Sequence, residues 1–274
     1  VRATIGRAYY RLGVADKAFL HHERALALRR RLFGEQSELV AESLVDCAWA
    51  CFEQQQSARG ETFAREALSI YGKRRVVGPP YICGLWALQK QLGAQERYAD
   101  VEAVTKEALA IAAKSPGIEF PEVANMIHGL AEAKVKQSEF ARAETLALEA
   151  VEMHRRLHGP EHLETAWALL SVGNARKGQQ KLADAEAAFR EALRIFRKYY
   201  SAGHKSVDLT MASLKSVLEA RGDSAGLEAL ERQRFTDANQ RIEGNDADAE
   251  AWMERALGNA DLKLWKAATA DSAE

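Results

Sequence analysis

The chain has 274 residues, of which 47% are hydrophobic and 28% are charged, and its formal net charge at pH 7 is −1. This composition is normal for a folded protein, and the near-zero charge argues against a general electrostatic attraction to DNA, RNA or an anionic membrane. Only 5 prolines interrupt segments rich in the helix formers Ala, Leu, Glu and Arg, and no apolar run approaches the roughly 20 residues that span a bilayer.

Three cysteines, Cys47, Cys51 and Cys83, indicate the compartment. An odd number without a framework spacing argues against a disulfide scaffold and favours a reducing environment. The chain begins at Val1 and shows no secretory signal sequence. We therefore expect a cytoplasmic location.

Small residues recur at a fixed spacing along the chain. Anchor alanines follow one another at intervals of 41 or 42 residues, at Ala25, Ala67, Ala108, Ala150 and Ala192. A second slim residue lies seven positions before each anchor, about two helical turns away and so on the same face: these are Ala18, Gly60, Val101, Ala143 and Ala185. A fixed period of this size indicates a solenoid, in which each repeat buries its apolar face on its neighbours.

A third set of small residues lies nineteen positions before the anchors, where the first helix of each repeat would contact the second. Its members are Gly6, Ala48, Gln89, Ala131 and Gly173. Gln89 is the exception, which leaves the register of the first helix in the third repeat open. In that repeat we also expect a longer turn between the helices, at residues 93–97.

Helix breakers and basic clusters separate the repeats. The breakers are Gly34, Pro79-Pro80, Gly117 with Pro121, Gly159-Pro160 and Gly203. Clusters such as Arg29-Arg30-Arg31 and Arg155-Arg156 end the second helices, where cations offset the negative end of the helix dipole. The alternative is that they form an electropositive stripe for an acidic partner or a nucleic acid.

The small-residue pattern resembles the tetratricopeptide repeat, in which small residues at three positions let two antiparallel helices pack. The 42-residue period and the opening Pro121-Glu122-Val123-Ala124 are similar to the longer variant found in kinesin light chains. HEAT repeats have a similar period, but no recurrent proline lies inside the first helix here. The resemblance implies an all-α fold, a right-handed superhelical solenoid of antiparallel helix pairs.

The resemblance divides the chain into three segments. Residues 1–232 form about six long repeats, the first of them truncated, and residues 233–247 form a helical, polar connector. Residues 248–274 resemble the start of an ordinary 34-residue repeat, because Trp252 and Ala268 are 16 positions apart. Arrays that mix the two repeat lengths are similar to the C-terminal regions of bacterial serine/threonine kinases, so both ends are expected to continue in a longer polypeptide.

The sequence contains no coherent catalytic motif. We find no phosphate-binding loop, no nucleophile elbow, no kinase loop set and no His-Glu-x-x-His motif. Cys47 and Cys51 share a helix face, and His154 and His158 can share another, but neither set completes a four-ligand metal site. We expect buried thiols, no metal, no cofactor and no enzymatic activity in this chain.

The tetratricopeptide resemblance implies a set of residues that face the inner groove. In such arrays the second, fifth, ninth and twelfth positions of each first helix line the concave face. By that count the lining residues are Trp49, Phe52, Trp86, Asn125, His128, Glu132, Trp167, Leu170, Asn174 and Lys177. Aromatic rings supply buried area and amides bind a backbone, so this mixture suits an extended peptide or a helix.

We therefore expect a protein–protein interaction module, a scaffold or regulatory arm that binds a peptide or helix of a protein partner and has no membrane contact. The alternatives are self-association, through the groove or the truncated ends, and binding of an acidic partner or nucleic acid through the basic edge. The last of these predicts an affinity that falls steeply with salt.

Overall fold

The computed structural model describes residues 1–115, 119–201 and 203–244, and within these ranges the chain forms twelve helices and no strand. Among these helices, none combines the length and the apolar character that crossing a membrane requires. The chain forms two compact units, which we call the N-terminal unit, Val1–Met153, and the C-terminal unit, from His154 onward. The boundary between them lies inside a helix.

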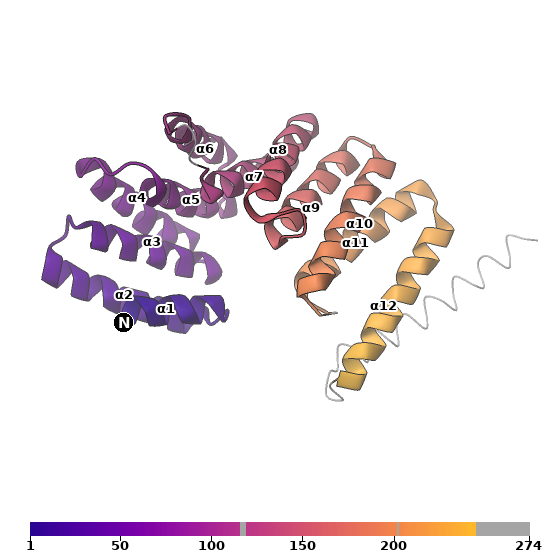
Figure 1. The fold of residues 1–274 in the computed structure, drawn as a ribbon, viewed down its shortest axis with the longest axis horizontal. Coiled ribbons are helices and arrows are strands. Elements are labelled where there is room, and N and C mark those ends of the chain that lie inside the picture. The colour runs from indigo at the N-terminus through magenta and orange to yellow at the C-terminus, as the bar shows by residue number, and fades with distance from the viewer. Residues whose placement is uncertain (116–118, 202, 245–274) are drawn as a thin grey trace, which may run out of the picture. The chain divides into compact units, whose positions relative to one another are not determined.

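The N-terminal unit is built from successive antiparallel helix pairs (Figure 1). Each helix from α1 to α6 contacts the next one, and α1, α3, α5 and α7 also contact one another in series. We call the surface of these four helices the first-helix face. The helices are α1 (Arg2–Arg11), α2 (Ala15–Phe33), α3 (Glu38–Glu53), α4 (Ser57–Lys73), α5 (Pro79–Ala94), α6 (Tyr98–Ala113), α7 (Pro121–Lys136) and α8 (Phe140–His158), which crosses the boundary.

The C-terminal unit repeats the same arrangement with α9 (Leu163–Gly178), α10 (Leu182–Tyr199), α11 (Lys205–Arg221) and α12 (Ser224–Gly244). Consecutive helices contact one another, and α9 also contacts α11. Helix α12 is continuous through residue 232, where we placed the end of the long repeats. The expected short repeat at 248–274 lies outside the described residues. The predicted all-α array of repeated helix pairs is confirmed.

The predicted breakers lie at the helix starts. Pro79 and Pro121 occupy the first turns of α5 and α7, where a missing backbone N–H costs no hydrogen bond. Gly34, Gly159 and Gly203 precede α3, α9 and α11 with φ angles of 80°, 91° and 82°, which side chains disfavour. Gly34 caps the end of α2, and the two prolines lie at the starts of α5 and α7, so the breakers separate one repeat from the next.

The turns inside the helix pairs are identical in length in the first five repeats, three residues each. Their central residues all have left-handed backbone: Gly13, Gln55, Glu96, Ser138 and Gln180, with φ between 58° and 71°. The expected longer turn at residues 93–97 is wrong, because α5 continues through Ala94 and the left-handed Glu96 reverses the chain at once. Helix starts at 38, 79, 121 and 163 keep the third repeat in register.

The small residues of the sequence pattern lie where the two helices of a repeat cross. All five anchor alanines and all five residues seven positions before them are buried. At Gly6 and Gly173 a Cβ atom would lie 2.6 Å from His22 Cε1 and 2.3 Å from Phe189 Cε1. His22 and Phe189 occupy a position on the second helix, three residues before the anchor alanine, that the sequence pattern missed. This position holds His22, Ala64, Thr105, Ala147 and Phe189.

This missed position explains Gln89. Where the first helix has glycine at the crossing, the second helix supplies a large ring. In the third repeat the larger side chain, Gln89, lies on the first helix instead. Buried Gln89 on α5 donates from Nε2 to Thr105 Oγ1 on α6, at 2.7 Å. The same nitrogen donates to Met126 O on α7, also at 2.7 Å. Buried Gln91 reaches the other way, to Ala48 O on α3 at 2.8 Å, so α5 is hydrogen-bonded to both neighbouring repeats.

Candidate functional site

The residues predicted to line a groove fall into two sets because the chain forms two units. Trp49 and Phe52 lie on α3, Trp86 on α5, and Asn125, His128 and Glu132 on α7, all within the N-terminal unit. Trp167, Leu170, Asn174 and Lys177 lie on α9, in the C-terminal unit. Each set is described within its own unit.

The centre of the first-helix face is an aromatic pair. The rings of Trp49 and Trp86 meet edge to face, with centroids 4.6 Å apart and planes at 69°. Both side chains are half-buried, so each ring keeps an exposed part. One turn along α3, Phe52 is also half-buried and lies 5.2 Å from Lys90 Nζ on α5. Three of the predicted residues therefore form one aromatic patch across α3 and α5.

A cavity of about 230 Å³ lies on one side of this patch. Its walls are Arg7, Tyr10, His22, Asp46, Trp49 and Trp86. The prediction omitted Arg7 and Tyr10. Both could have been found, because the count that gave Trp49 and Phe52 in the second repeat gives Arg7 and Tyr10 as the ninth and twelfth positions of the first.

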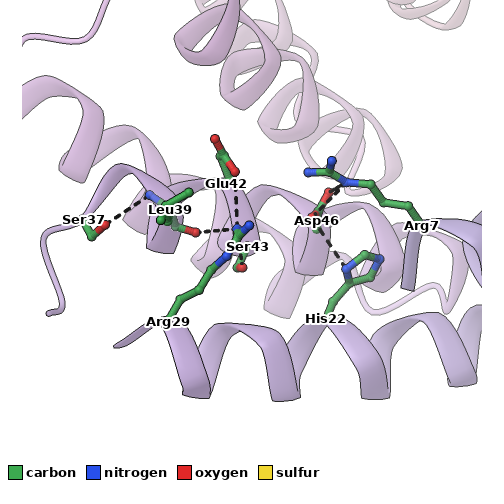
Figure 2. Close-up of polar contacts among 8 residues, drawn as sticks. All are labelled: Arg7, His22, Arg29, Ser37, Leu39, Glu42, Ser43 and Asp46. Carbon is green, nitrogen blue, oxygen red and sulfur yellow. Dashed lines mark hydrogen bonds and ion pairs between the residues drawn. The ribbon is translucent and has the colours of Figure 1, made fainter. Parts of the chain in front are cut away.

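Asp46 is the electrostatic centre of this cavity. Arg7 Nε donates to both carboxylate oxygens of Asp46, at 3.0 and 3.2 Å, and His22 Nδ1 lies 3.7 Å from Asp46 Oδ2 (Figure 2). Burial lowers the pKa of His22, which keeps the ring neutral at pH 7. Tyr10 donates to Glu53 Oε1 at 3.4 Å, and burial raises the pKa of its hydroxyl. The cavity thus pairs neutral rings with a compensated ion pair.

A second, larger cavity of about 330 Å³ lies beyond Phe52. Its lining residues are Phe52, Gln89, Lys90, Gly93, Ala94, Glu96, Tyr98, Val101, Gly129, Glu132, Ala133 and Lys136. Val101, Ala133 and Gln89 are buried walls, whereas Glu96, Glu132 and Lys136 are exposed at the mouth. The predicted residue Glu132 therefore borders a cavity, and its carboxylate lies 3.8 Å from Nε2 of half-buried His128.

The predicted residues of the C-terminal unit make more internal packing contacts than those of the N-terminal unit. Trp167 packs edge to face on Phe196, with centroids 4.9 Å apart, and Phe196 is fully buried. Leu170 is buried, with 4% of its surface exposed, so its side chain belongs to the core. Lys177 Nζ donates to Ser216 Oγ on α11 at 2.7 Å. This set offers less free surface than the N-terminal one.

The histidines and cysteines hold structural positions. His154, His158 and His162 form a stack in which the His158 and His162 rings are 4.5 Å apart, although His162 lies outside α8 and caps α9 by accepting from Glu164 N. Cys47 and Cys51 are buried in α3, and burial raises the pKa of the Cys51 thiol to about 11. In the ranges that the structure describes, no set of three His, Cys, Asp or Glu side chains is arranged to hold a metal.

The basic clusters contact carboxylates of neighbouring repeats. Arg30 Nη2 lies 2.5 Å from Glu66 Oε1, and Arg155 Nη2 lies 3.1 Å from Glu191 Oε1. Arg29 donates to Leu39 O and Ser43 Oγ at 2.7 and 2.9 Å (Figure 2). These arginines join one repeat to the next, which weakens the interpretation of the clusters as a free positive stripe.

The family model described as Tetratricopeptide repeat matches residues 2–73 and 122–198, more than half of the chain. No curated protein matches the chain. Among solved structures, BtubC (BKLC) from P. vanneervenii is 20% identical over 83% of this chain and 92% of its own, with a TM-score of 0.70.

Two further solved structures are similar to this chain. The repeats of a Podosopora anserina putative kinesin light chain are 18% identical over 72% of this chain and 94% of their own, with a TM-score of 0.57. A Rap protein complexed with competence and sporulation factor is 16% identical over 96% of this chain and 75% of its own, with a TM-score of 0.64. At these identities the likeness is one of fold.

Proposed function

The chain belongs to the tetratricopeptide repeat family, and from that premise we propose that its N-terminal unit binds a peptide or helical segment of a protein partner on the first-helix face. The observation that carries the proposal is the half-exposed Trp49–Trp86 pair, which borders one cavity and continues through Phe52 to a second. Aromatic anchors beside cavities are the usual centres of protein interfaces.

The chemistry of the face supports binding rather than catalysis. Buried His22, which borders the smaller cavity from α2, is held neutral, and Asp46 on α3 is already paired with Arg7. Lys90 Nζ lies over the Phe52 ring, and the larger cavity is lined by two lysines and two glutamates, which suits a segment of mixed polarity. We therefore assign the chain a non-catalytic role as a scaffold or regulatory arm, without a cofactor, in the cytoplasm.

A protein of similar fold is found in complex with a partner. One of the similar structures is a Rap protein complexed with competence and sporulation factor, which supports partner binding as the proposed role. A shared fold does not identify the partner of the present chain, because recognition depends on the side chains at the binding surface and not on the fold. We extend the proposed contact surface to Asn125, His128 and Glu132 on α7, and to Trp167, Asn174 and Lys177 in the C-terminal unit as a second surface.

A display experiment tests this proposal. Random 15-residue peptides are selected on the full chain, and the dissociation constants of the enriched peptides are measured for the wild type and for Trp49→Ala. Truncation of an interface tryptophan costs about 2 kcal/mol or more, so we expect a loss of affinity of roughly 30-fold. Circular dichroism checks that the helical content is unchanged.

Arg155→Ala acts as the matched control, because it removes a charge from the basic edge and should leave the selected peptides bound. The proposal is wrong if no peptide is enriched. It is also wrong if Arg155→Ala abolishes binding while Trp49→Ala does not, because the partner then uses the basic edge.

A further inference from the structure

Helical glycines of this protein are mostly explained by contact with a neighbouring side chain. A Cβ atom on Gly60 would lie 2.5 Å from Gln91 Cδ, and one on Gly129 would lie 2.8 Å from Gln89 Oε1. On Gly84 it would lie 3.0 Å from a Leu68 methyl carbon. A larger residue would displace a packed group at each of these positions.

Gly93 on α5 is different. A Cβ atom there would meet only Val101 Cγ2, at 3.9 Å, which is an ordinary van der Waals contact, and its φ is not in the left-handed region. The equivalent positions in the neighbouring first helices carry Phe52 and Val135. Glycine inside a helix is about 0.5–1 kcal/mol less stable than alanine. Internal packing therefore does not account for Gly93.

The consequence of the missing side chain is the cavity of about 330 Å³, which Gly93 and Gly129 both line. This volume is at the lower end of the roughly 300–1,000 Å³ typical of ligand pockets. Phe52, Tyr98, Val101 and Ala133 supply apolar surface, and the charged lining residues are two lysines and two glutamates. The cavity therefore selects its occupant by shape and apolar character and not by charge.

Gln89 adds a polar feature to the same cavity. Thr105 Oγ1 donates its proton to Val101 O at 2.6 Å, so it must accept from Gln89, and Met126 O can only accept. Both hydrogens of Gln89 Nε2 are therefore used, which fixes the orientation of the amide. Gln89 is 98% buried and its Oε1, beside Gly129, has no hydrogen-bond partner among the described residues. A buried acceptor without a donor is unfavourable.

We propose that this cavity is an anchor pocket for one large apolar side chain of the partner, with Gln89 as part of its buried wall. The side chain takes the place that Phe52 and Val135 fill in their own repeats. This inference rests on the proposed function, since it names a pocket of the first-helix face, but it is tested without a natural partner.

The probes are capped amino acids: N-acetyl-phenylalanine amide and N-acetyl-leucine amide, with N-acetyl-glycine amide as the blank. Binding is followed in two-dimensional NMR spectra of the full chain, which is labelled with ¹⁵N. We expect the apolar probes to cause saturable shifts of the Gly93 and Gly129 amides and of the Gln89 side-chain amide. The blank should cause none. Absence of shifts with both apolar probes would contradict the inference.

Gly93→Val fills the pocket with the side chain that α7 carries at the equivalent position. We expect at least a tenfold loss of probe affinity with an unchanged or higher melting temperature. Gly72→Val is the matched control, because a Cβ atom on this helical glycine meets nothing within 4 Å and lies outside the cavity. A large fall in melting temperature for Gly93→Val alone would assign Gly93 a structural role and overturn the inference.

The two proposals can fail separately. Selected peptides that depend on Trp49 but bind Gly93→Val with unchanged affinity would leave the proposed function intact and contradict the anchor pocket. Capped amino acids that bind at Gly93, together with a display selection that enriches nothing, would support the pocket and contradict the peptide-binding function.

Discussion

The third and fifth repeats solve the same packing problem in opposite ways. In the fifth repeat the first helix has Gly173 and the second helix fills the crossing with Phe189, which is fully buried. In the third repeat the first helix supplies the bulk through Gln89, and the second helix has the smaller Thr105. Either helix can therefore supply the larger side chain at the crossing, and in the second and fourth repeats neither does, because both positions hold alanine.

The two solutions differ in what they leave open. Phe189 fills its crossing with a fully buried apolar ring. Gln89 instead directs its amide toward Thr105 and Met126 and leaves an acceptor and a cavity beside Gly129. The hydrogen bonds fix the orientation of the Gln89 side chain in the third repeat. The space that this side chain does not fill is the cavity that we propose as the anchor pocket.

Substitutions at the apolar crossing should have the largest effect. Phe189→Ala removes a fully buried ring and should lower the free energy of unfolding by about 3–5 kcal/mol. Gly173→Leu forces a side chain against the ring and should lower it by about 1–3 kcal/mol. Urea denaturation of each variant measures both values.

The double variant tests whether volume is shared across the crossing. If the total volume matters, Gly173→Leu with Phe189→Ala should be clearly more stable than the sum of the two single effects predicts. Strict additivity of the two effects would mean that the residues pack independently, and the comparison with the third repeat would then lose its basis.

The comparison shows how far the sequence predicts this fold. The period of 41 or 42 residues, the anchor alanines and the breakers predicted the helix pairs, because small residues and turns act locally. The role of Gln89 was not predicted, because its bulk is balanced by Thr105 on another helix and by Gly129 in the next repeat. The length of the turn at residues 93–97 was wrong for a local reason, because a left-handed Glu96 reverses the chain without the expected extra residues.

The candidate site was predicted only in part. Counting along each first helix brought Trp49, Phe52 and Trp86 to one surface, and the structure places them in one patch. The count could not give the cavities, because these depend on side chains that are absent, at Gly93 and Gly129. It also could not tell that Leu170 is buried. Groove binding and the relation to bacterial kinases stay predictions.

A repeated carboxylate extends the comparison to the joints between repeats. Glu102 on α6 and Glu186 on α10 occupy equivalent positions, each with a cation four residues later and another from the following helix pair. Glu102 also binds Lys134, whose side chain is only 4% exposed, at 2.9 Å, whereas the partner of Glu186 across the joint, Arg221, is 37% exposed. The joint after the third repeat is therefore the more buried one.

Glu102→Gln should accordingly cost about 1.5–3 kcal/mol, because buried Lys134 loses a charged partner, and Glu186→Gln should cost under about 1 kcal/mol. Hydrogen bonds from Lys106, Lys134 and Arg142 lower the pKa of Glu102. A lowered folded-state pKa contributes stability above the unfolded value of about 4.3 and loses it as the pH falls further. The difference between wild type and Glu102→Gln should thus be full at pH 7 and shrink below about pH 4 in urea titrations. Equal effects at pH 7 and pH 2 would contradict it.

The turns should show the smallest effect and no difference between the two repeats. Glu96 and Gln180 have φ angles of 58° and 61°, and their N–H groups donate to Gly93 O and Lys177 O at the same distance of 3.0 Å. A residue with a side chain costs about 1–2 kcal/mol in left-handed backbone, and replacing it with glycine removes this cost. Part of the resulting gain in stability is offset, because glycine is freer in the unfolded chain. Glu96→Gly and Gln180→Gly should each raise the stability by up to about 1 kcal/mol, as measured by thermal melting. A gain for Gln180→Gly with a loss for Glu96→Gly would instead assign the Glu96 side chain a packing role at the mouth of the larger cavity.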